Sequence, residues 1–176
     1  MEEQNYFDFY GIPESFEPDE TLIKRKFYEL SKKYHPDFYV NEDEAAQDRV
    51  LELATLNNEA YKVLSDPGKR IAYILGSKGM IAEGDKYTLP QDFLMEMMDV
   101  NEALMDLQME PDAERLEQVK RDIAKIDAAL QAEMKEHTAA YSSAPEPRKV
   151  LEAIRDIWYR QRYLWRLEES LAKIES

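Results

Sequence analysis

Apolar side chains recur every three or four residues along most of this 176-residue chain. That spacing places them on one face of an α-helix. It is clear over residues 21–34, again in the segment that ends at Leu64, and in three longer segments beyond residue 90. No segment alternates apolar and polar residues in the manner of a half-buried strand. The pattern predicts an all-α protein.

Two of the predicted helices form a pair near the N-terminus. The first is expected to begin near Asp19 and to run to about Tyr34, because Pro36 offers no N–H and pushes His35 out of helical geometry. The second follows a loop that reaches about Asn41, and so short a connection favours an antiparallel hairpin. The two apolar faces are Ile23, Phe27, Leu30 and Tyr34, and Val50, Leu53, Asn57, Ala60 and Leu64.

A cluster of glycines marks a boundary between two domains. Three of the five glycines in the chain fall within nine residues, at Gly76, Gly79 and Gly84. Such clusters are typical of exposed connections between domains. We therefore expect an N-terminal helical-hairpin domain over 1–78, a linker over 79–90 and a C-terminal domain over 91–176. Three helical patterns in the last segment, separated by short turns, predict an antiparallel three-helix bundle.

The helix over 21–34 is cationic on the face opposite its apolar one. Five cations stand there against the single acid Glu29, in a protein whose formal net charge is −14. A lone surface charge is usually just solvated, but a basic face in an acidic chain favours docking to an acidic partner. The cations are Lys24, Arg25, Lys26, Lys32 and Lys33.

A basic helix followed by His35-Pro36-Asp37 resembles the J-domain, the part of a co-chaperone that docks on a DnaK-type chaperone and stimulates its ATPase. The later segments Glu59–Pro67 and Lys69-Arg70 resemble the third and fourth J-domain helices. The resemblance implies that Asp37 meets charged groups on the chaperone, while His35 and Pro36 fix the loop. It implies that the helix face steers the encounter through Lys24, Arg25, Lys32 and Lys33.

The first helix of the expected bundle, 91–109, has more apolar residues than one buried face can use. A sufficient core stripe is formed by Phe93, Met97, Val100, Leu104 and Leu107. An adjoining face keeps Leu94, Met95 and Met98, followed by the acids Asp99, Glu102 and Asp106. This face is either an acid-rimmed partner site or a second buried side, and periodicity alone leaves both interpretations open.

The order of J-domain, glycine-containing linker and three-helix bundle, together with Phe93-Leu94-Met95-Glu96, is similar to the HscB family of iron–sulfur co-chaperones. This second resemblance favours the partner site. It implies binding of the scaffold protein IscU through Leu94, Met95, Met98, Asp99, Glu102 and Asp106, with Tyr159 as an aromatic contact on the last helix. It also implies an HscA or DnaK-type chaperone as the second partner.

Composition excludes several other functions. The chain has no cysteine and only two histidines, so thiolate chemistry and cysteine-ligated metals are excluded. It also lacks a glycine-rich phosphate loop, and we expect no enzymatic activity, no cofactor and no metal. The net charge of −14 disfavours nucleic acid and anionic membranes. No apolar run reaches the roughly 20 residues that span a bilayer, and we expect a cytoplasmic protein.

Two further interpretations remain open from the sequence. The protein could be a J-protein for a different client, or a helical interaction module in which His-Pro-Asp occurs by chance. Four arginines near the C-terminus alternate with aromatic residues, a pattern that superficially suggests nucleic-acid binding. Nearby acids favour a solvated, ion-paired helix face instead. These arginines are Arg155, Arg160, Arg162 and Arg166.

Overall fold

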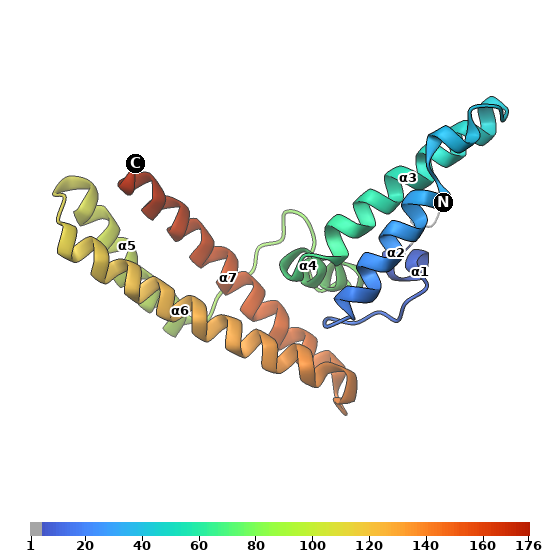
Figure 1. The fold of residues 1–176 in the computed structure, drawn as a ribbon. Helices are drawn as coiled ribbons and strands as arrows, with labels where there is room; N and C mark the ends of the chain where they lie inside the picture. The colour runs from blue at the N-terminus through green and yellow to red at the C-terminus, as the bar shows by residue number, and fades with distance from the viewer. Residues whose placement is uncertain (1–4) are drawn as a thin grey trace. The chain divides into compact units, whose positions relative to one another are not determined.

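A computed structural model describes residues 5–176 and divides the chain into two compact units, Met1–Lys78 and Gly79–Ser176. The described residues form α-helices and short 3-10 turns without any strand, which confirms the predicted all-α class (Figure 1). The N-terminal unit contains α1 (Tyr6–Tyr10), α2 (Glu20–Lys33), η1 (Pro36–Tyr39), α3 (Glu44–Leu64) and α4 (Pro67–Ser77). The C-terminal unit contains α5 (Gln91–Met109), α6 (Ala113–Ala140), η2 (Tyr141–Ser143) and α7 (Pro147–Glu175).

Aspartate side chains set the starts of the N-terminal helices. Asp19, Asp43 and Asp66 cap α2, α3 and α4, each accepting a hydrogen bond from a backbone N–H in the first turn. These bonds satisfy donors that a helix start otherwise leaves unpaired. The helices α2 and α3 then pack as the expected antiparallel hairpin (Figure 1).

A buried amide joins the three first helices. Asn57 of α3 is 1% exposed, and its Nδ2 donates to the carbonyl of Phe27 at 3.1 Å and to Oγ of Ser31 at 3.1 Å, both in α2. Its Oδ1 accepts the hydroxyl of Tyr10, in α1, at 2.9 Å. Burial raises the pKa of Tyr10 well above its ordinary value, so the phenol stays a donor. The network fixes the register in which α2 and α3 pack.

The fourth helix is attached by a buried cation. Arg70 is 5% exposed, and its guanidinium donates to the carbonyl of Phe16 at 3.0 Å and to that of Leu64 at 2.6 Å. Burial lowers the pKa of Arg70. The side chain thus ties α4 to the end of α3 and to the chain before α2, which is a structural task.

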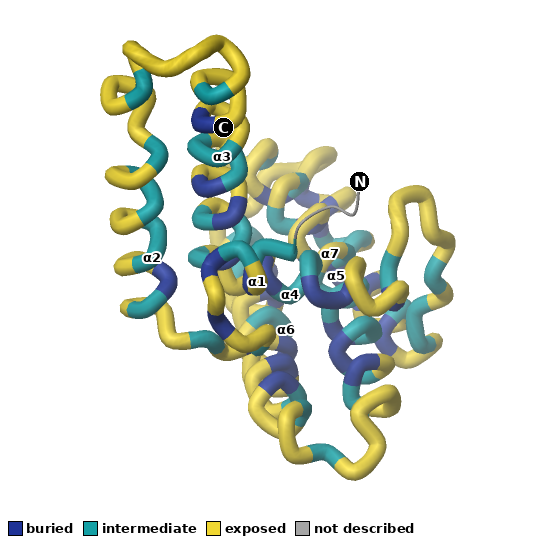
Figure 2. The backbone as a smooth tube through the Cα atoms, turned by 90° about the vertical axis from the view of Figure 1, so that its right-hand side faces the viewer, coloured by how far each residue is buried: buried dark blue, intermediate teal, exposed yellow. Residues whose placement is uncertain are grey.

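The C-terminal unit is a three-helix bundle in which α7 packs on both α5 and α6. All five residues of the expected α5 core stripe are buried, from 0% to 8% exposed. The helix α6 buries Val119, Ile123, Leu130 and Met134. Figure 2 shows these buried stretches alternating with exposed ones along the helices.

The segment expected to be a linker is partly attached to the bundle. Tyr87 stacks on Tyr159 of α7 with ring centroids 4.3 Å apart, and its hydroxyl donates to Asp156 at 2.8 Å. The guanidinium of Arg155 lies 5.4 Å from the centre of the Tyr87 ring. Residues 79–90 therefore do not form a free tether along their whole length.

One of the C-terminal arginines differs from the expected solvated face. Arg160 pairs with Asp156 at 2.6 Å, but the two side chains are only 24% and 20% exposed. Its guanidinium also lies 5.6 Å from the ring centre of Phe93 in α5. Arg160 is therefore ion-paired as expected but not solvated, because it forms part of the α5–α7 packing. Arg162 instead covers the ring of Trp158 on the outside of α7.

Candidate binding surfaces

The His-Pro-Asp segment forms an ordered turn instead of the expected loop. His35 caps the 3-10 helix Pro36–Tyr39, and its Nδ1 accepts the N–H of Asp37 at 3.3 Å. Pro36 takes the first helical position, where its fixed φ is suited and its missing N–H costs nothing. The Asp37 side chain remains 84% exposed, with Oδ2 3.6 Å from His35 Nδ1. Histidine and proline thus shape the turn, and the carboxylate points into solvent.

Contacts on both sides hold this turn in place. The hydroxyl of Tyr39 donates back to the carbonyl of Lys33, the last residue of α2, at 2.9 Å. On the α3 side, Nε2 of Gln47 donates to the carbonyl of Glu42 at 2.9 Å and to that of Val40 at 3.3 Å. A surface held in one conformation loses little conformational entropy when a partner binds.

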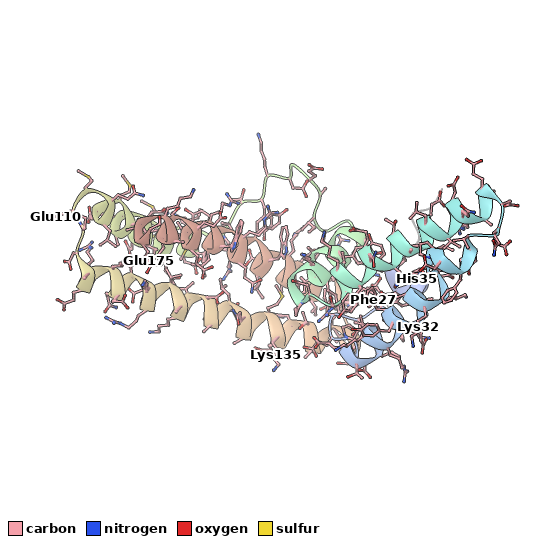
Figure 3. All side chains as sticks on the ribbon, turned by 45° about the horizontal axis from the view of Figure 1, so that its top comes forward. Phe27, Lys32, His35, Glu110, Lys135 and Glu175 are labelled. Atoms are coloured by element: carbon pink, nitrogen blue, oxygen red, sulfur yellow. The ribbon has the colours of Figure 1, made fainter. Side chains whose placement is uncertain are left out.

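The four cations predicted for docking are all exposed on α2, which leads into the same turn. Figure 3 labels one of them, Lys32, together with His35 at the start of the turn. Within the described residues, Lys24, Arg25 and Lys32 form no ion pair, while Lys33 lies 5.2 Å from the ring centre of Tyr34. Lys26, by contrast, pairs with Glu29 at 3.7 Å. The structure therefore brings the unpaired cations and the His-Pro-Asp turn together on one unit.

Sequence reasoning missed one aromatic residue of the basic face. Tyr28 is 54% exposed and lies three residues after Arg25 and four before Lys32, so the three side chains share one side of α2. The spacing of Tyr28 from Arg25 (+3) and of Lys32 from Tyr28 (+4) could have indicated from the sequence that the ring lies on the basic face.

On α5, the structure separates a buried stripe from an outward apolar face. Met95 and Met98 are 61% and 67% exposed, and Leu94 is partly exposed beside them. The carboxylates of Asp99 and Glu102 are also exposed. Asp106 is exposed but engaged, since it accepts from Arg115 of α6 at 3.0 Å.

The apolar face of α5 extends further than the sequence prediction. Met105 and Met109 are 63% and 85% exposed. They follow Met98 at +7 and +11, a helical repeat that could have identified them. Together with Met95 they form a line of methionines about 21 Å long at 1.5 Å per residue. Methionine suits a surface that adapts to a partner, because its side chain is flexible and polarisable.

The structure does not bring Tyr159 onto α5. Its ring contacts Tyr87 and Trp158. Tyr163 of α7 does contact α5, with its ring centroid 6.1 Å from that of Phe93 and its hydroxyl accepting from Asn101 at 3.0 Å. One face of Tyr159 is thus covered by the segment that precedes α5.

Among residues 5–176 no group of three or more histidine, cysteine or acidic side chains is arranged to hold a metal ion. No helix in the same range is both long and apolar enough to cross a bilayer.

Two family models match the chain, one on each unit. The DnaJ domain matches residues 5–73. The model described as the HSCB C-terminal oligomerisation domain matches residues 89–172.

Curated relatives and solved structures agree with these matches. The chain is 32% identical to a co-chaperone protein HscB homolog of Vibrio vulnificus, over 77% of each chain. It is 31% identical to the iron-sulfur cluster co-chaperone protein HscB of Mus musculus, over 96% of this chain and 68% of the relative. The structure of human co-chaperone protein HscB matches with a TM-score of 0.70 at 28% identity, covering 99% of this chain and 84% of that one. Chaperone HscB from Vibrio cholerae matches with a TM-score of 0.63 at 25% identity, covering 98% of each chain.

Proposed function

The chain belongs to the HscB family of J-domain co-chaperones of iron–sulfur cluster assembly, and we propose that its two units bind two different partners. Membership makes it a non-enzymatic J-protein that stimulates the ATPase of an Hsp70-type chaperone. The proposal adds the identity of the partners and the residues that bind them: an HscA or DnaK-type ATPase on the N-terminal unit, and an IscU-type scaffold on the C-terminal bundle.

The chaperone site consists of the ordered turn and the basic face of α2. The exposed carboxylate of Asp37 meets cationic groups of the chaperone, while His35 and Pro36 keep the turn in its 3-10 conformation. Lys24, Arg25, Lys32 and Lys33 raise the association rate by steering toward an acidic surface. The observation that carries this assignment is the exposed Asp37 in a turn that is hydrogen-bonded on both sides.

The scaffold site consists of the outward face of α5. Met95 and Met98 supply exposed apolar anchors, and Leu94 is partly exposed beside them, so that one partner can bury all three together. Asp99, Glu102 and Asp106 surround them and favour a partner with basic groups at matching positions. On α7 we retain Tyr159 as the aromatic contact, through the ring face that Tyr87 does not cover.

Holding both partners on one molecule explains the co-chaperone activity. With the J-type domain over 1–78, the scaffold-binding domain over 91–176 and residues 79–90 between them, one chain raises the effective concentration of the client for the ATPase. The ATP binds to the chaperone, and the nascent cluster belongs to the scaffold. We place this activity in the cytoplasm.

The scaffold site is tested by calorimetric titration of the full chain with an apo IscU-type scaffold. Replacing Leu94, Met95 and Met98 by alanine should weaken binding by about 2 kcal/mol or more for each anchor that is buried in the complex. The matched control is Trp165→Ala, which removes a 58% exposed side chain from α7 and should leave the affinity unchanged. A triple variant that binds normally refutes the assignment, and a triple variant that melts much lower identifies the face as core.

The chaperone site is tested by ATPase stimulation of a purified DnaK-type chaperone. His35→Gln and Asp37→Asn should abolish stimulation without changing helicity or melting temperature, because both side chains lie on the surface. Reversing Lys32 and Lys33 to glutamate should slow association most at low salt. Stimulation that survives Asp37→Asn would refute the assignment of the turn.

A different client remains the second candidate, since the apolar face of α5 fits any partner with an apolar, basic-flanked surface. It is favoured if the wild-type chain stimulates the ATPase but does not bind the scaffold.

A further inference from the structure

Three exposed apolar side chains surround the end of the His-Pro-Asp turn. Phe38 is 73% exposed, Val40 65% and Leu51 58%. Phe38 directly follows Asp37 in sequence, and Leu51 lies on α3, opposite the turn. Single exposed apolar residues are common on protein surfaces. Val40 and Leu51 line one hollow beside the docking motif, and Phe38 lies in the turn between two further lining residues, Asp37 and Tyr39. We call these three side chains the apolar patch, and their exposure needs a separate explanation.

This hollow of about 270 Å³ adjoins the turn, and Val40 and Leu51 both line it. The rest of its apolar lining comes from Pro36, Tyr39 and Val50, and the polar side chains of Gln47 and Asp48 line its α3 side. The hollow opens between the 3-10 turn and α3, and Asp37 is part of its rim. A partner group that reaches Asp37 therefore lies next to apolar surface as well.

The patch is ordered by contacts that do not bury it. The N–H of Phe38 donates to the carbonyl of His35 at 3.1 Å. The rings of these two residues lie edge to face, with centroids 5.9 Å apart and an interplanar angle of 67°. The side chain of Phe38 is thus positioned in advance while most of its surface stays in water. Folding gains little from such a side chain, whereas a partner that covers it gains the full burial.

We propose that Phe38, Val40 and Leu51 form an apolar docking patch for the Hsp70-type ATPase, continuous with the His-Pro-Asp turn. The inference rests on the proposed docking role of that turn, and it adds a complementary contribution to binding. Cations on α2 supply attraction that salt screens. Burial of the patch supplies affinity that salt does not screen, and the shape of the hollow selects chaperones with an apolar group beside their contact for Asp37.

The test titrates the full chain into a purified DnaK-type chaperone and measures the steady-state ATPase rate at each concentration. The titration is carried out at low and at high salt. The double variant Phe38→Ala with Val40→Ala should need about tenfold more protein for half-maximal stimulation, a typical loss for removing buried apolar anchors. The factor should be equal at both salt concentrations, and the maximal stimulation should be unchanged. The matched variant Phe38→Leu keeps an apolar side chain and should stay within about twofold of the wild type.

Several outcomes would overturn the patch. A double variant with unchanged half-maximal concentration removes it directly. A lower maximum at unchanged half-maximal concentration shows that Phe38 acts only through the His35 turn. Sedimentation that shows a wild-type dimer and a monomeric double variant identifies the patch as a contact between copies of this chain. If Asp37→Asn retains full stimulation of the ATPase, the proposed docking role of the turn is refuted together with the patch. If Asp37→Asn loses stimulation while the double variant behaves like the wild type, only the patch is refuted.

Discussion

Replacing Asn57 by alanine should destabilise the N-terminal unit by about 3 kcal/mol. The change removes three hydrogen bonds, to the carbonyl of Phe27, to Ser31 and from Tyr10. A buried hydrogen bond contributes about 1 kcal/mol net. The loss stays near that sum because the partners keep other bonds: Ser31 donates to the Phe27 carbonyl at 2.7 Å, and Tyr10 donates to the Asn57 carbonyl at 3.2 Å. Asn58→Ala is the control, because Asn58 is exposed in the same helix.

The two units can be followed separately in one urea titration. Both tryptophans of the chain, Trp158 and Trp165, lie in α7, so indole fluorescence reports the C-terminal unit. Far-UV circular dichroism reports helices of both units. We expect Asn57→Ala to move the part of the dichroism transition that fluorescence does not follow, and to leave the fluorescence midpoint unchanged. Equal midpoints for the Asn57 and Asn58 variants would refute the role of the buried network.

Two further predictions concern the C-terminal unit. Burial raises the pKa of the Glu168 carboxyl, so ionisation of this group lowers the stability of the folded state. The loss of stability is absent below the unfolded pKa of about 4.3 and complete above the raised folded pKa. Glu168→Gln should therefore raise the free energy of unfolding at pH 7 by less than about 1 kcal/mol, and with it the thermal midpoint, but should not do so at pH 4. An equal gain in the exposed Glu169→Gln would contradict this reason. Tyr87→Ala removes a ring stack and the hydrogen bond to Asp156. Backbone hydrogen exchange should therefore accelerate over 79–90, with a smaller change in Tyr87→Phe, which keeps the ring. Identical exchange in both variants and the wild type would show that the stack does not hold the segment.

The candidate surfaces were only partly accessible from sequence. Periodicity separated the buried α5 residues from Leu94, Met95 and Met98, because a helix that packs on one side exposes the other. It stopped short of Met105 and Met109, although both continue the same face. Tyr159 was placed from a resemblance, and no local pattern indicates that Tyr87 covers one of its faces.

The sequence by itself determined the elements of this protein. Helical spacing of apolar residues, aspartate caps and prolines act over a few residues, so their consequences can be read locally. The His-Pro-Asp motif and the basic face of α2 are also local features, and they sufficed to predict the J-type domain.

Tertiary structure decided which polar groups are buried and which apolar groups are not. The apolar spacing placed Asn57 on the buried face of α3, but only the packing of α1 and α2 against it supplies its hydrogen-bond partners. Nothing local indicates that Arg70 is buried against the end of α3 and the chain before α2. Phe38 is among the most apolar residues near the motif, yet its turn leaves it in solvent. Burial depends on residues far apart in the chain, and for that reason the network at Asn57 and the patch at Phe38 appear only in the folded molecule.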